Sequence, residues 1–206
     1  PSFVYSRFRV THRAVSFQHL FGALRTPPDA VEFGTSLVDN GHRRTLPSSK
    51  RFVAHRIGLA VTDRLELGIH ESVIYGDRGF ELAYAIPISI LVGAQSYAGD
   101  TDNLAIGVDL SYRLRDQAKL YGALFLDDLS KFSPSAFSNQ LGIQIGAFWV
   151  DPLGLSESNV RIEYVRLEPY TYAHNFDINA YTHFDGVLGH PLGPNSDNAS
   201  IEIQGW

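Results

Sequence analysis

The sequence of 206 residues predicts an all-β fold: a segment of an antiparallel transmembrane β-barrel with about eight meander strands. Three observations lead to this prediction. Apolar and polar residues alternate along many short segments. The connections between these segments are short and long in turn. No run of about 18 apolar residues is present, so the sequence predicts no transmembrane helix.

The alternation is clearest in the stretch NLAIGVDLSY, residues 103–112. Successive side chains of a strand point to opposite sides, so every second residue shares a face. The stretches LELGIHES, LGIQIGAFW, VRIEY and ASIEIQ repeat the pattern, which predicts one aliphatic and one polar face. In 103–112 the aliphatic face would carry Leu104, Ile106, Val108, Leu110 and Tyr112, and the polar face Asn103, Ala105, Gly107, Asp109 and Ser111.

The candidate strands are residues 8–24, 50–61, 65–75, 103–113, 119–127, 138–150, 159–167 and 198–206. The first is too long for one regular strand, and we expect it to contain a bulge or an extension. Outer-membrane barrels have short periplasmic turns and long outer loops, whereas compact soluble domains seldom carry several long connections. A soluble β-sandwich or a lipocalin-like barrel would show the same alternation and is the alternative fold. The short connections are 62–64, 114–118 and 151–158, and the long ones are 25–49, 76–102, 128–137 and 168–197.

Composition limits the function classes. The net charge is −5, with 19% charged residues, so we expect no nucleic-acid partner. The absence of cysteine excludes a disulfide framework and a cysteine-ligated metal site. The chain begins at Pro1 and has no methionine, and we interpret it as a single barrel domain over residues 1–206, truncated at both ends. Glu202 and Gln204 support this, because they stand in step with Trp206 where a terminal barrel strand carries apolar residues.

Polar side chains recur on the predicted inner side of the strands, and both signs of charge are present there. A cross-strand ladder would stiffen the barrel or hold a plug, while a polar route or binding site is the functional alternative. Glycines inside the strand patterns would permit curvature and the close approach of whatever fills the lumen. The predicted lumen-facing polar residues are Arg56, Glu66, His70, Asp109, Asp127, Arg161, Glu163 and Glu202, and the glycines are Gly58, Gly68, Gly107, Gly122, Gly142 and Gly146.

The long connection 168–197 is dense in aromatic rings and ends in LGHPLGPNSD. Its prolines lower the entropy of the loop and its glycines permit turns. Aromatic rings can pack on the apolar face of a sugar, while amides and carboxylates bind sugar hydroxyls. We therefore predict a polysaccharide site in this outer loop, although these groups could instead only brace the loop. Tyr170 and Tyr172 are assigned to the membrane interface. The predicted site residues are Tyr181, His183, His190, Asn195 and Asp197.

Catalytic motifs are weak. Asp127 and Asp128 are neighbours in a strand, so their side chains point to opposite faces and cannot share a proton. The sequence contains neither an HExxH motif nor a GxSxG elbow, and several histidines fall on different strands. We expect no enzymatic activity, no metal and no other cofactor. A passive porin or transporter barrel and an outer-membrane hydrolase are the alternative functions. The histidines in question are His12, His19, His55 and His70.

Residues 50–206 resemble the Wzi-type capsule assembly family. The resemblance rests on KRFVAHRIGL, ESVIYGDRGFELAYAIPISI, YAGDTDNLAIGVDLSY, KLYGALFLDDL, RIEYVRLEPYTYAH and NAYTHFDGVLGHPLGPNSD. It implies an outer-membrane barrel with a helical plug that helps to attach capsular polysaccharide or exopolysaccharide to the surface of a Gram-negative-type bacterium. It also implies lectin-like binding without catalysis, with outer-membrane lipid as the other partner. We expect a monomeric barrel of more strands than this chain supplies.

Overall fold

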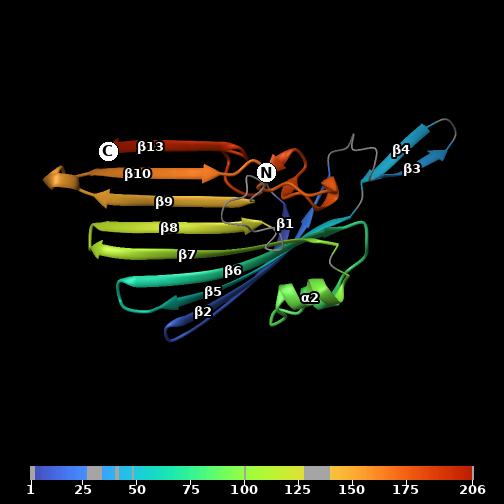
Figure 1. Ribbon diagram of the computed structural model, residues 1–206, viewed down its shortest axis with the longest axis horizontal. Coiled ribbons are helices and arrows are strands. Elements are labelled where there is room, and N and C mark those ends of the chain that lie inside the picture. The colour runs from blue at the N-terminus through green and yellow to red at the C-terminus, as the bar shows by residue number, and fades with distance from the viewer. Residues whose placement is uncertain are drawn as a thin grey trace.

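The computed structural model describes residues 3–26, 34–39, 42–47, 49–99, 101–127 and 140–205. Their main feature is one antiparallel sheet of nine strands, in which each strand pairs with the next along the chain (Figure 1). The sheet is open in this chain and is consistent with a segment of a β-barrel. Its strands are β1 (Val4–His12), β2 (Val15–Leu24), β5 (Lys50–Ala60), β6 (Leu65–Gly76), β7 (Asn103–Arg115), β8 (Ala118–Asp127), β9 (Leu141–Val150), β10 (Ser158–Leu167) and β13 (Ser196–Gly205).

Smaller elements lie in the connections between the strands of the sheet. The hairpin β3 (Gly34–Asp39) and β4 (His42–Pro47) lies between β2 and β5. The helices α1 (Leu82–Ala85) and α2 (Leu91–Tyr97) lie between β6 and β7. No helix among the described residues is long and apolar enough to cross a membrane. In the described ranges the remaining elements are two 3-10 helices, η3 (Pro152–Gly154) and η4 (Asp177–Asn179), and the two-residue strands β11 (Thr182–His183) and β12 (Gly186–Val187).

The predicted all-β, antiparallel fold is confirmed, with one correction at the start of the chain. Residues 8–24 were expected to form one irregular strand, but β1 and β2 form a hairpin in which His12 pairs with Val15. Arg13 takes the turn at φ 52°, a left-handed conformation that a sequence without Gly, Asn or Asp at this point does not signal. The meander therefore has nine strands. Asp128, Trp206 and the connection predicted at 128–137 lie outside the described residues.

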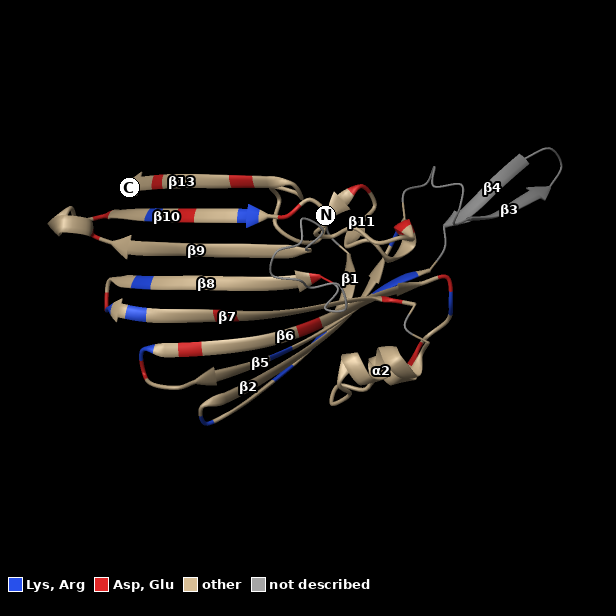
Figure 2. Cartoon of the chain, in the orientation of Figure 1, with Lys and Arg blue, Asp and Glu red and all other residues tan. Residues whose placement is uncertain are grey.

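The strand register gives the sheet two chemically different faces. Directly paired residues point to the same side of an antiparallel sheet. Ile57 pairs with Ile69, which in turn pairs with Val108, and we call their side the aliphatic face. Arg56 pairs with His70, and we call their side the polar face. Figure 2 shows charge on the main strands as separate bands and at the short turns, with long uncharged stretches between them.

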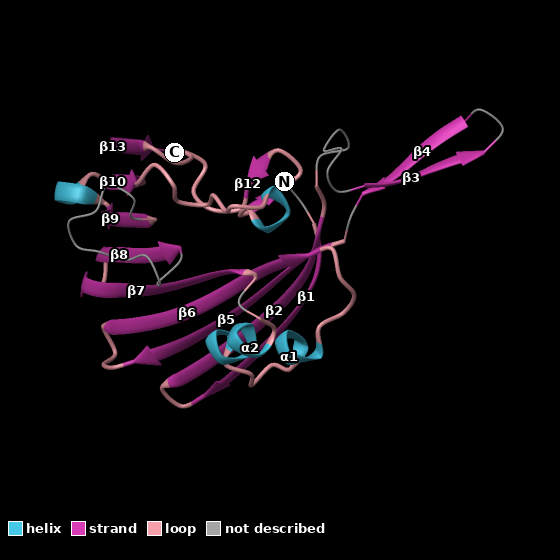
Figure 3. Ribbon diagram, turned by 45° about the vertical axis from the view of Figure 1, so that its right-hand side comes forward, coloured by secondary structure: helices cyan, strands magenta, loops and turns pink. Residues whose placement is uncertain are grey.

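Different segments of the chain pack on the two faces of the sheet. The connection after β10 folds onto the polar face and brings Tyr172 and Tyr181 into one cluster with Leu24, Ile74 and Leu167. Helices α1 and α2 pack on the aliphatic face at the end of the sheet from which the long connections leave (Figure 3). The polar face and the connection 168–195 therefore hold the candidate site.

Candidate binding site on the polar face

Tyr172 fixes the connection between β10 and β13 to the sheet. Its backbone N–H donates to the Asp127 carboxylate at 2.6 Å, and its hydroxyl accepts a hydrogen bond from the His190 N–H at 3.0 Å. Its φ of 74° is left-handed, and for a bulky residue such a conformation persists only where surrounding contacts hold it. The ring lies where a side chain on Gly189 would be, so only glycine fits there. The predicted place of Tyr172 at a membrane interface is wrong because its ring is buried, whereas Tyr170 is exposed.

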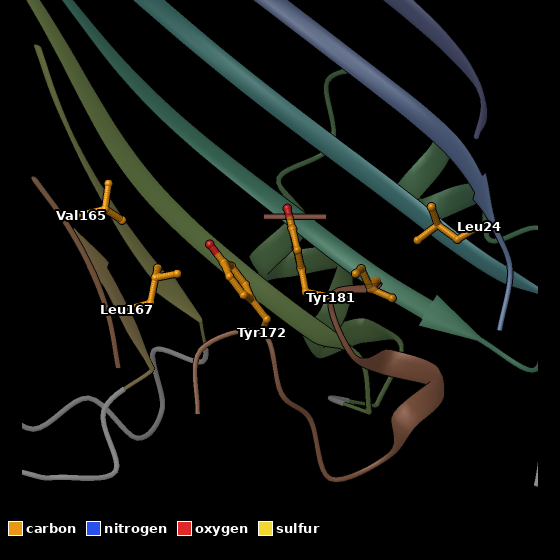
Figure 4. Close-up of a cluster of buried hydrophobic side chains, with 6 residues drawn as sticks. Leu24, Val165, Leu167, Tyr172 and Tyr181 are labelled. Carbon is orange, nitrogen blue, oxygen red and sulfur yellow. The ribbon is translucent and has the colours of Figure 1, made fainter. Parts of the chain in front are cut away.

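Tyr181 is the second buried anchor of this connection. Its ring stacks on Tyr172 with the centroids 5.7 Å apart and meets Phe52 and Phe125 edge-on. Its hydroxyl hydrogen-bonds to the Ser72 hydroxyl at 3.1 Å. Burial raises the pKa of Tyr181, so the hydroxyl stays protonated at neutral pH. Figure 4 shows the two tyrosine rings side by side, between Leu24 and the β10 residues Val165 and Leu167.

Four further hydrogen bonds tie the same connection to the sheet and to the residues just before β7. The buried Lys50 ammonium donates to the Ala180 carbonyl at 2.7 Å and to the Thr182 hydroxyl at 3.1 Å. The Asn103 amide donates to the Asn179 carbonyl at 3.0 Å, and the Asn179 amide donates to the Thr101 carbonyl at 2.8 Å. These contacts satisfy buried polar groups, which would otherwise cost free energy. The connection is thus a fitted cover and not a projecting loop.

A cavity of about 650 Å³ lies between this cover and the polar face. This volume is typical of pockets that bind small ligands or single units of larger ones. The ring of Phe125 joins those of Tyr172 and Tyr181 in its wall. Residues with hydrogen-bonding side chains line it from both the sheet and the cover, among them Arg7, Gln18, Arg56, His70, Gln144 and His190.

His190 is a further hydrogen-bonding residue that the cover contributes to this cavity, beside Tyr172 and Tyr181. Its Nδ1 accepts a hydrogen bond from the Leu192 N–H at 3.2 Å. A neutral imidazole with Nδ1 as acceptor carries its proton on Nε2. His190 therefore offers one N–H donor in addition to the groups of the sheet.

An ionic cluster lines the cavity floor and continues along the polar face. The Arg56 guanidinium donates to both carboxylate oxygens of Asp109, at 3.0 and 2.6 Å, and to Glu66 at 3.2 Å. The His70 imidazole lies 3.8 Å from the Asp109 carboxylate. Such forked contacts are the stronger kind of charged hydrogen bond. A side chain at Gly68 would overlap both Arg56 and Asp109, so glycine makes room for the pair.

A second polar cluster lies on β8, β9 and β10. The Tyr121 hydroxyl and the Gln144 amide both donate to the Glu163 carboxylate, at 2.7 and 2.8 Å. Arg161 and Glu202 approach to 3.6 Å across β10 and β13. All eight residues predicted to face a lumen lie on the polar face. Among the six predicted glycines, Gly122 lies on the aliphatic face, where it pairs with Leu110.

The five predicted polysaccharide residues do not converge on one point. Tyr181 and His190 line the main cavity. Asn195 and Asp197 are exposed and line a separate pocket of about 170 Å³. His183 is buried, and its Nδ1 accepts a hydrogen bond from the Arg25 N–H at 3.0 Å.

Sequence reasoning predicted that Arg56 and His70 face this side of the sheet, but it missed three other sheet residues that line the cavity. Gln18, Arg7 and Gln144 come from three strands and are brought near His190 only by the curvature of the sheet. Their single signal in the sequence is an inward position in the alternation, which many other polar residues share. Gln144 had such a position, but nothing in the sequence separates it from its neighbours.

Two of the histidines predicted on separate strands meet in space. His19 Nδ1 and His55 Nε2 lie 2.8 Å apart, and His55 Nδ1 lies 3.1 Å from the Glu71 carboxylate. All three are on the aliphatic face, where His19 pairs with His55 and His55 pairs with Glu71. Within the described ranges no group of three or more His, Asp or Glu could hold a metal ion.

Comparison with known proteins gives one match. The model of the family described as capsule assembly protein Wzi matches residues 30–206. No curated protein and no solved structure matches the chain. The match covers most of the nine-stranded sheet, both helices and the cover of the polar face. The chain belongs to the Wzi family of capsule assembly proteins.

Proposed function

We propose that this chain forms part of the wall of a monomeric outer-membrane β-barrel that holds capsular polysaccharide or exopolysaccharide at the cell surface without catalysis. Family membership supports a role in capsule assembly. The polysaccharide contact, the membrane location and the absence of catalysis are the further content of the proposal.

The observation that carries the proposal is the chemistry of the cavity under the 168–195 connection. Rings of Phe125, Tyr172 and Tyr181 offer apolar surface for the ring of a sugar. Gln144 and His190 offer hydrogen-bonding groups beside them. Sites that combine aromatic surface with a few placed polar groups bind ligands specifically. Because the cover is fixed by buried contacts, it loses little entropy when a ligand binds.

The proposed membrane location follows from the exposed apolar residues of the aliphatic face. Large apolar residues are exposed on it over most of the main strands, among them Ile57, Ile69, Val108, Ile162 and Ile203. A soluble protein rarely exposes so broad an apolar surface, whereas the outer face of a membrane barrel must be apolar to meet lipid. The polar face would then line the lumen, as barrel interiors do.

The predicted residues have distinct roles in this proposal. His190 contacts the sugar in the cavity and Tyr181 forms its wall. His183 holds the cover through Arg25. Asn195 and Asp197 add an outer contact at the second pocket, which is exposed and therefore contributes less.

The test uses the full-length protein in capsule-producing cells. His190→Ala with Gln144→Ala should increase the fraction of polysaccharide shed into the medium, because two hydrogen-bonding side chains beside the aromatic wall of the cavity are lost. Asp185→Ala, an exposed residue of the same connection, is the matched control and should retain polysaccharide normally. Asn195→Ala with Asp197→Ala should give a smaller increase. Heat-modifiable migration on a gel confirms that each variant still folds as a barrel.

Purified protein supplies the second measurement. Wild-type protein should bind isolated polysaccharide and leave its chain length unchanged, while the His190 and Gln144 double variant should bind more weakly. Full retention and full binding by a folded double variant would reject the cavity as the sugar site. Shortened saccharide products would point instead to a hydrolase.

A further inference from the structure

The segment 80–97, which contains α1 and α2, is unusually apolar for an exposed connection. Glu81 is its only charged residue, and an ion pair with Arg78 at 3.9 Å partly neutralises it. The side of the segment that faces the sheet buries Tyr84, Leu91 and Ala94. The other side is also apolar, so the segment has no polar surface of the kind that a helix in water normally presents.

Contacts with the sheet fix this segment in place. Tyr84 packs on Tyr75 of β6 with the ring centroids 5.1 Å apart. The Tyr84 hydroxyl donates to the Asp102 carboxylate at 2.6 Å, and the same carboxylate pairs with Arg78. The Leu91 N–H at the start of α2 donates to the Glu71 carboxylate at 3.0 Å. The outward side chains therefore belong to a segment that is fixed to the sheet.

The outward side chains include Ile88, Ile90 and Tyr97, which are 87%, 70% and 85% exposed. Phe80 and Leu82 add further exposed apolar surface. So many exposed apolar side chains within one short segment mark a site of contact with another apolar phase. Its position identifies that phase, because the segment covers the same face of the sheet that the proposed function assigns to lipid.

Continuity with the aliphatic face is visible along single strands. On β6, Val73 is buried beneath the segment, while Ile69 lies on the same face and is half exposed. Glu71 stands between them and is hydrogen-bonded to His55 and to α2. Without the segment, the side chains of Glu71 and His55 would be exposed on the aliphatic face. The segment thus replaces a polar stretch of this face with an apolar one.

We propose that segment 80–97 is a membrane-interface collar whose outward side chains insert among the acyl chains of the outer leaflet, beside the strands that cross the membrane. This inference rests on the proposed membrane location. Helices that lie in the plane of the interface, with an apolar face buried at the boundary of the acyl chains, are a known way for a protein to bind a bilayer surface. Tyr97, at the C-terminal end of α2, has the amphipathic ring that interfaces favour.

The absence of cysteine from this chain permits a site-specific test, with any cysteine elsewhere in the full-length protein replaced. Ile88→Cys, Val108→Cys and Gln117→Cys are introduced singly and labelled with an environment-sensitive fluorophore. Each labelled full-length protein is reconstituted into phosphatidylcholine vesicles with acyl chains brominated either near the headgroup or near the chain end. Ile88 is almost fully exposed, so its replacement leaves packing intact.

The collar predicts that the label at Ile88 is quenched most by bromine near the headgroup and is protected from aqueous iodide. The label at Val108, in mid-strand on the aliphatic face, should be quenched most by bromine near the chain end, and that at Gln117 only by iodide. A label at Ile88 that behaves like Gln117 while Val108 is quenched by lipid overturns the collar and leaves the barrel standing. Loss of lipid quenching at Val108 as well overturns the membrane location itself.

Discussion

At the scale of single residues, glycines and large polar side chains on the polar face are matched to one another. A side chain at Gly68 would overlap the Asp109 carboxylate, and one at Gly107 would overlap the His70 imidazole. The polar residues can lie flat across the sheet only because their neighbours have no Cβ. Glycine weakens an isolated strand, but here it makes room for the charged contacts that hold the strands together.

This matching predicts the effect of Gly68→Ala. The added methyl group would displace Arg56 from Asp109, and overpacking of this kind costs about 1–3 kcal/mol. Gly122→Ala is the control, because the nearest atom to its new Cβ would be 3.5 Å away, an ordinary contact. The midpoint of heat-induced unfolding on a gel should fall for the first variant and stay near the wild-type value for the second. Equal midpoints would show that Arg56 and Asp109 adjust without loss.

Asp127 gives a second prediction at this scale. Asp127→Ala removes the acceptor of the buried Tyr172 N–H, and an unsatisfied buried donor costs about 1–3 kcal/mol. The left-handed Tyr172 should then lose its support, and the 168–195 cover should open. Limited proteolysis of the folded protein should cut this cover faster in Asp127→Ala than in the control Asp185→Ala. Unchanged cleavage would mean that Tyr181 and Lys50 hold the cover alone.

The sequence predicts which face of the sheet a residue points to better than it predicts which residues it contacts. Alternation placed Arg56 and Asp109 on one side because a strand leaves only two choices. It could not show that Tyr172 is buried, since that depends on the cover folding back onto the sheet. It also could not bring His19 next to His55, because the pairing of β2 with β5 spans a long connection.

At the scale of elements, strands with strict alternation were predicted to within a few residues. The range 103–113 became β7 at Asn103–Arg115, and 159–167 became β10 at Ser158–Leu167. The hairpin at the start was missed because its turn uses Arg13 without glycine or asparagine. The helices were missed because each is shorter than two helical turns and gains its stability from packing on the sheet.

The two faces of neighbouring strands give an element-scale prediction. Val108→Arg on β7 places a charge on the aliphatic face, which costs about 2–4 kcal/mol near the midplane of a bilayer. Ala123→Arg on β8 points into the cavity of the polar face and should be tolerated. Assembly into outer membranes, measured by heat-modifiable migration, should fall for Val108→Arg only. A defect confined to Ala123→Arg would mean that the lipid-facing side has been assigned to the wrong face.

At the scale of the whole molecule, the short turns of the meander lie at one end of the sheet, and the strand ends that flank the long connections lie at the other (Figure 1). Connection lengths in the sequence were enough to predict this asymmetry, because antiparallel neighbours must alternate their ends. The cavity could not be predicted, since it needs the curvature of the sheet and the folding back of residues 168–195 together. The proposed function depends on this asymmetry, because the cavity serves surface polysaccharide only if the long connections face outward.

The accessibility of the two ends to a membrane-impermeant thiol reagent tests this central claim most directly. Asp185→Cys lies in the cover of the polar face, and Gln117→Cys lies in the short turn between β7 and β8. Both residues are exposed, so folding does not hide either thiol. On intact cells the account predicts labelling at position 185, with labelling at 117 only after the outer membrane is permeabilised. Labelling at 117 on intact cells, with 185 protected, would contradict it.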